Sequence, residues 1–123
     1  MGIALWVAQG LLAVAFLVAG ATKLAQPKEK LAKNMAWVED FSQPAVRLIG
    51  AVEVLGAIGV VLPALTGILA WLTPLAALAL AATMVGAVLT HVRRGERSAV
   101  VPPGVLLVLA ALVAYGRFFV LPA

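Results

Sequence analysis

The sequence predicts an all-α membrane protein, a four-transmembrane-helix bundle, and two observations lead to this prediction. Of the 123 residues, 64% are hydrophobic and only 11% are charged, whereas soluble domains average about 45–50% apolar and about 25% charged residues. Long apolar segments also occupy most of the chain, at residues 3–22, 46–62, 68–90 and 102–121. A helix needs about 20 residues, within a range of about 17–25, to cross a hydrocarbon core. We therefore expect residues 1–123 to form a single transmembrane domain.

The first segment, residues 3–22, has two interpretations. Ala19-Gly20-Ala21 matches the small-residue cleavage site of a signal peptide. However, no basic residue precedes the segment, and its apolar run exceeds the usual length of about 7–15 residues. We expect it to be the first membrane span.

The joint between the first two segments, residues 23–45, predicts a short amphipathic helix at the membrane surface. Its apolar residues recur at helical spacing, at Leu31, Met35, Val38 and Phe41. Its lysines occupy another face of this helix. The alternative is an irregular polar loop.

Prolines delimit the later spans, because Pro63 ends the second, and Pro102 with Pro103 opens the fourth.

Basic residues predict the orientation in the membrane. Lys and Arg concentrate on the cytoplasmic side of membrane proteins, and here they fall in the two joints 23–45 and 91–101: Lys23, Lys28, Lys30, Lys33, Arg93, Arg94 and Arg97. The turn at 63–67 has no charge. We expect both termini outside, both basic loops cytoplasmic, and a location in the cell (inner) membrane. These basic residues are expected to set topology and contact the lipid bilayer, and no nucleic acid is expected as a partner.

Glu53 lies near the middle of the second span, where a charge costs about 2.5–3.5 kcal/mol on insertion scales. We expect it to face the bundle interior, either as a proton or ligand site or as half of an ion pair. At about 1.5 Å per residue, Thr83 of the third span lies at nearly the same depth. His91 at the end of that span is the other candidate ligand contact, although a histidine there is often only interfacial. The remaining polar residues predict a buried network: Lys23, Arg47, Arg117 and Gln9.

Several kinds of chemistry lack a sequence signal. There are no cysteines, which excludes a thiol redox role. One histidine and one deep carboxylate do not make a tightly bound metal site. Nucleophile–base pairs, phosphate loops and dinucleotide fingerprints are also missing. The sequence therefore favours a protein that is not an enzyme.

Five stretches together resemble the DoxX-like family of small membrane proteins. They are GATKL at 20–24, WVEDFSQP at 37–44, VRLIGAVEVLGAIGVVLP at 46–63, MVGAVLTHVRRGE at 84–96 and YGRF at 115–118. The resemblance spans essentially the whole chain. It implies a four-helix bundle with recurrent polar positions at Lys23, Arg47, Glu53, His91 and Arg117. It also implies an association with membrane redox proteins, since the family is named after a subunit of a thiosulfate:quinone oxidoreductase.

Three functions stay open on the sequence. The first is an accessory or ligand-binding subunit that holds a quinone or a lipid, with an oxidoreductase partner on the basic loops. The second is a lipid-binding or assembly protein whose buried charges specify the bundle. The third is a small proton-coupled transporter using Glu53, which would depend on formation of a homo-oligomer.

Overall fold

The computed structural model describes residues 2–31 and 41–120, and its described elements are all helical. They are α1 (Gly2–Ala25), α2 (Lys28–Leu31), α3 (Gln43–Gly59), α4 (Leu62–Thr66), α5 (Leu72–Arg93), the 3₁₀ turn η2 (Ser98–Val100), α6 (Val101–Tyr115) and the π-helical segment η3 (Gly116–Val120). Four helical stretches are long and apolar enough to cross a membrane: Gly2–Ala25, Gln43–Thr66, Leu72–Arg93 and Ser98–Val120. The predicted all-α membrane fold is therefore confirmed.

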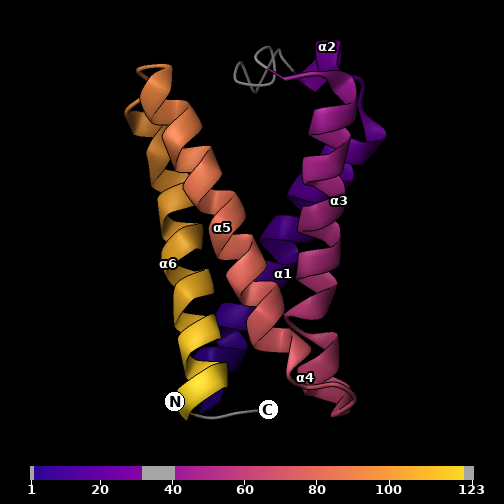
Figure 1. Cartoon of the computed structure of the whole chain (residues 1–123), viewed down its shortest axis with the longest axis vertical. Coiled ribbons are helices and arrows are strands. Elements are labelled where there is room, and N and C mark those ends of the chain that lie inside the picture. Colours follow the sequence, from indigo (N-terminus) through magenta and orange to yellow (C-terminus); the bar gives the residue numbers. More distant parts are fainter. Residues whose placement is uncertain (1, 32–40, 121–123) are drawn as a thin grey trace.

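The helices form two pairs that cross. α1 packs along α3, and α5 packs along α6. Figure 1 shows the two pairs close together near α4 and spread apart at the end that carries α2. We call these the α4 end and the α2 end of the bundle. α1 begins and η3 ends at the α4 end, as four consecutive crossings require.

The second span is broken near its end. Pro63 has no backbone N–H and cannot continue the hydrogen-bond ladder of α3. The helix therefore stops at Gly59, turns through Val60 and Val61, and resumes as α4. α4 ends at Thr66 and is followed by Gly67, whose φ of 74° is the left-handed conformation that glycine adopts without strain.

This break changes the predicted boundaries. Residues 63–67, expected to form the turn, are largely α4, and the turn lies just after it. The predicted start of the third span at residue 68 is wrong, because α5 begins at Leu72. The predicted amphipathic helix falls mostly on residues 32–40, which lie outside the described residues; only its first turn is seen, as α2.

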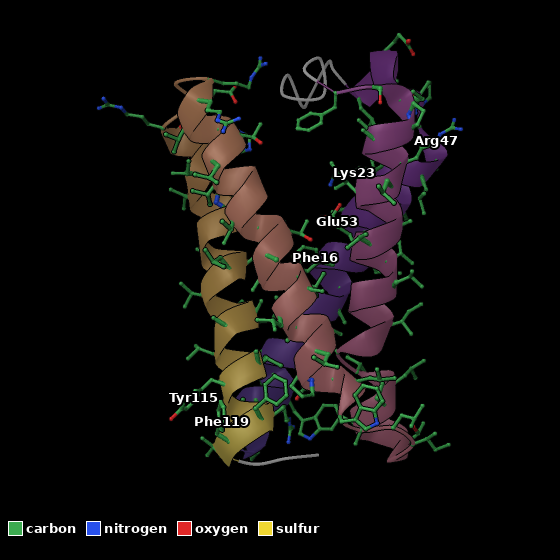
Figure 2. The ribbon with its side chains drawn as sticks, in the orientation of Figure 1. Phe16, Lys23, Arg47, Glu53, Tyr115 and Phe119 are labelled. Atoms are coloured by element: carbon green, nitrogen blue, oxygen red, sulfur yellow. The ribbon has the colours of Figure 1, made fainter. Side chains whose placement is uncertain are left out.

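The core lies between the pairs, toward the α4 end. It is made of small and medium apolar side chains around Phe16 (Figure 2) and Leu80, both almost fully buried. Large apolar side chains cover the outside instead, among them Ile3, Leu55 and Phe119. An outer surface of this kind is stable in lipid and not in water, which agrees with a membrane-spanning bundle.

Candidate functional site

A backbone crossing of α1 and α3 brings Lys23 and Glu53 together. A Cβ added at Gly20 would lie 2.6 Å from the Gly50 carbonyl oxygen, and one added at Gly50 would lie 2.8 Å from the Gly20 oxygen. Only glycine allows this approach, which is how small residues bring membrane helices together. Lys23 and Glu53 each follow their glycine by three residues, so they share the face that makes the crossing.

The Lys23–Glu53 ion pair is buried. Lys23 Nζ donates a hydrogen bond to Glu53 Oε1 over 2.6 Å, and the two side chains are only 7% and 3% exposed. Removing one partner of such a pair leaves an uncompensated buried charge, which costs about 3–5 kcal/mol. Lys23 is therefore the cation that pairs with Glu53.

A second ionic cluster lies at the α2 end, on α5 and the turn after it. His91 Nδ1 and Glu96 Oε1 are 2.9 Å apart, and Arg94 Nε lies 3.4 Å from Glu96 Oε2. Gly95 makes the turn possible with a φ of 71° and so returns Glu96 toward His91. The hydrogen bond from His91 lowers the pKa of the Glu96 carboxyl below its ordinary range.

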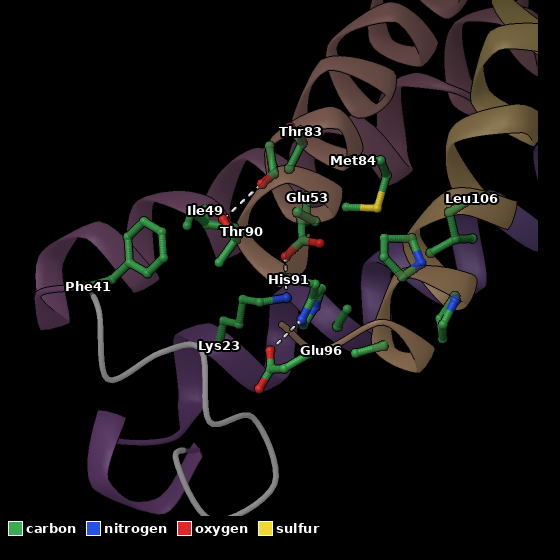
Figure 3. Close-up of a pocket in the computed structure, with 16 residues that line it drawn as sticks. Lys23, Phe41, Ile49, Glu53, Thr83, Met84, Thr90, His91, Glu96 and Leu106 are labelled. Atoms are coloured by element: carbon green, nitrogen blue, oxygen red, sulfur yellow. Dashed lines mark hydrogen bonds and ion pairs between the residues drawn. The ribbon is translucent and has the colours of Figure 1, made fainter. Parts of the chain in front are cut away.

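Residues of both ionic clusters, Lys23, Glu53, His91 and Glu96, line one cavity of about 670 Å³. Figure 3 shows Lys23 and Glu53 on one side of it, with His91 and Glu96 close by. The cavity lies where the two helix pairs spread apart, and most of its wall is apolar: Ala19, Phe41, Ile49, Met84, Gly86, Ala87, Ala99, Pro102, Pro103 and Leu106. The hydroxyl-bearing Thr83 and Thr90 complete the lining. An apolar cavity of this size with a few convergent polar groups is typical of a small-molecule site.

Gly86 marks open space in this wall. A Cβ built at Gly86 meets no atom within 4 Å, although the residue lies in the middle of α5. A side chain added there would extend into the cavity rather than into a neighbouring helix. Gly10 of α1 is equally open but does not line the cavity, so it provides a matched control position.

The α4 end holds a different polar cluster. Gln9 is fully buried; its Oε1 accepts a hydrogen bond from Arg117 Nε over 2.9 Å, and its Nε2 donates to the Val60 carbonyl oxygen over 2.6 Å. The Arg117 guanidinium also lies 5.2 Å from the Trp6 ring centre, within cation–π range. Gln9 thus satisfies a carbonyl that the break after α3 removes from the helical ladder.

The predicted site residues divide into three groups. The structure brings Lys23, Glu53, Thr83 and His91 to the cavity, and it joins Gln9 and Arg117 in the separate cluster. The prediction that Arg47 belongs to the buried network is wrong, because its side chain is exposed on the outer side of α3 (Figure 2). At about 100° per residue, Arg47 lies about 120° around the helix from Glu53. This helical spacing was the signal that could have excluded it.

The sequence does not single out two polar residues of the cavity wall, Thr90 and Glu96. Glu96 lies in a basic loop, and Thr90 is one of several threonines in apolar helices. A glycine directly after a helix commonly forms a turn, so Gly95 could have indicated that the chain reverses there and brings Glu96 close to His91. Among the described residues, no cluster of three acidic, histidine or cysteine side chains is arranged to hold a metal ion.

Comparison with known proteins identifies the class of protein that this bundle and cavity define. The pattern of the DoxX-like family matches residues 7–113, which include the second and third spans and most of the first and fourth. The chain belongs to the DoxX-like family. No curated protein and no solved structure matches it.

Proposed function

We propose that this DoxX-like membrane protein is a non-catalytic accessory subunit that binds a lipid-soluble ligand, a quinone or a lipid, in the cavity at its α2 end. One observation carries the proposal: a buried ion pair borders an apolar cavity large enough for a small molecule. Polar groups at such depth are costly in lipid and tend to mark functional sites. The redox chemistry would belong to the ligand and to a partner enzyme.

The first test identifies small molecules that co-purify with the protein in native lipid particles. Mass spectrometry would compare wild type with Glu53→Gln, which alters the polar wall, and with Gly86→Leu, which fills the cavity. Gly10→Leu adds the same side chain on a helix face outside the cavity. We expect a defined ligand in wild type and Gly10→Leu, and its loss in Gly86→Leu and Glu53→Gln. An identical small-molecule content in all four proteins would refute ligand binding at this site.

An assembly function is the second candidate, and the Lys23–Glu53 contact itself favours it. The pair joins α1 to α3 and would serve to fix the bundle that a membrane partner recognises. This alternative predicts a co-purifying protein, with no ligand and with full tolerance of Gly86→Leu. Pull-down of the four proteins above, followed by identification of bound chains, separates the two candidates.

We also propose that the α2 end faces the cytoplasm and that both termini lie on the opposite, outer side of the inner membrane. Lys and Arg residues are more numerous near the α2 end than near the α4 end. Among the described residues near the α4 end, the cation is Arg117 of η3. The chain has no cysteine, so single cysteines can be introduced for labelling. A membrane-impermeant maleimide added to intact cells should label Gly67→Cys and leave Gly95→Cys unlabelled. The reverse pattern would invert the proposed topology.

A further inference from the structure

The threonines of the cavity wall offer acceptors to a ligand. Thr83 Oγ1 donates its hydrogen to the Ala79 carbonyl oxygen over 2.9 Å, and Thr90 Oγ1 donates to the Gly86 oxygen over 2.8 Å. A hydroxyl has one donor hydrogen and two acceptor lone pairs. With both hydrogens engaged by the backbone of α5, what each threonine presents to the cavity is oxygen lone pairs.

Glu53 presents the same kind of group. Its Oε1 accepts from Lys23, and Figure 3 shows the second carboxylate oxygen directed away from Lys23, on the side of Met84. Met84 is itself part of the lining. A carboxylate paired with an ammonium group accepts hydrogen bonds and donates none.

In its neutral form, His91 also presents an acceptor, because of its partner. The Glu96 carboxylate can only accept, so the hydrogen between them sits on His91 Nδ1. In the neutral imidazole the other nitrogen, Nε2, then carries a lone pair. The carboxylate thus fixes the tautomer of the neutral histidine.

Among the described residues, each carboxylate at the cavity has a cation beside it. The two carboxylates of Glu53 and Glu96 are matched by the cations of Lys23 and Arg94, which lie against them. An anionic head group would have to compete with these carboxylates for the same cations. The cavity is therefore suited to an uncharged ligand.

From this inventory we propose that the cavity selects a neutral ligand that carries a hydroxyl donor on an apolar body, as an alcohol, a phenol or a hydroquinone does. The corresponding ether, carbonyl or carboxylate compounds bind less well. This inference rests on the proposed function, because it concerns the same cavity. For a quinone-type ligand it means that the reduced, hydroxyl-bearing form is the one preferred.

The test uses three probes that share one apolar body: dodecylphenol, its methyl ether and dodecylbenzoate. Native mass spectrometry of the whole protein in mild detergent gives the fraction carrying each probe at equal concentration. The variants are Thr83→Val, which removes one acceptor at nearly constant shape, and Gly86→Leu, which fills the cavity. Thr22→Val is the matched control, since Thr22 makes the same kind of bond to the Val18 oxygen, over 2.7 Å, away from the cavity.

We expect the phenol to bind wild type about two- to tenfold better than the ether, the range of one net hydrogen bond. Thr83→Val should reduce this ratio, Thr22→Val should leave it unchanged, and Gly86→Leu should abolish binding of every probe. Equal binding of phenol and ether, or preferential binding of the benzoate, with both blocked by Gly86→Leu, overturns the inference and leaves the proposed function standing. If no probe shows binding that Gly86→Leu blocks, the inference and the proposed function fall together.

Discussion

The two ends of the bundle hold buried polar groups in different ways. At the α4 end, Gln9, Arg117 and the Val60 carbonyl join α1, α3 and η3 where the helix pairs converge. At the α2 end, Lys23 and Glu53 form a buried pair that borders open volume. The first cluster compensates a broken helix, whereas the second places charge beside a space that it does not fill. This difference is why we propose a structural role for the α4 end and a binding role for the α2 end.

The largest expected effect comes from breaking the buried pair. Lys23→Met should lower the free energy of unfolding by about 3–5 kcal/mol, because Glu53 is left buried without its cation. The double variant Lys23→Met with Glu53→Leu should recover much of this loss, since no isolated charge remains. Thermal unfolding in detergent, read by circular dichroism, measures both. A double variant as unstable as the single one would contradict the assignment of the pair as the dominant interaction.

An intermediate effect is expected at the opposite end. Gln9→Leu leaves the Val60 oxygen and Arg117 without their bonds to Gln9, and should cost about 1–3 kcal/mol. Gln9→Glu keeps an acceptor for Arg117 but loses the donor to Val60, so it should cost less. The free energy of unfolding is measured for both variants, and each variant is analysed for bound ligand. Loss of bound ligand in a folded Gln9→Leu protein would mean that the two ends do not have separate roles.

The smallest expected effect concerns Glu96 at the cavity mouth. Its pKa is lowered in the folded protein, chiefly by the hydrogen bond to His91, so its stabilising contribution is present above the ordinary range of a carboxyl group. That contribution is lost as the pH falls through the lowered value. The melting temperature of wild type should therefore exceed that of Glu96→Gln slightly at neutral pH, and the difference should vanish in acid. A difference that grows on acidification would show that the carboxylate is not stabilised as described.

Much of the fold could be predicted from the sequence, because hydropathy and helix length are local properties. The four spans, their order and the depth of Glu53 follow from counting apolar residues against the thickness of a bilayer. The same counting placed Thr83 at nearly the depth of Glu53, and both residues line the cavity. It could not locate the start of α5, because the break at Pro63 is followed by a further helical turn, α4, before the chain reverses after Gly67.

The sequence by itself determined that this protein is a four-helix membrane bundle with a deep carboxylate. Only the tertiary structure decided that Lys23 is the partner of Glu53 and that Glu96 joins His91 at the cavity. It also decided that Arg47 lies outside the buried polar network. Depth along a helix depends on residue count alone, whereas pairing depends on how the helices are rotated and how closely they approach. Here the approach of Gly20 and Gly50 fixes that rotation, and the spreading of the helix pairs opens the space beside the charges.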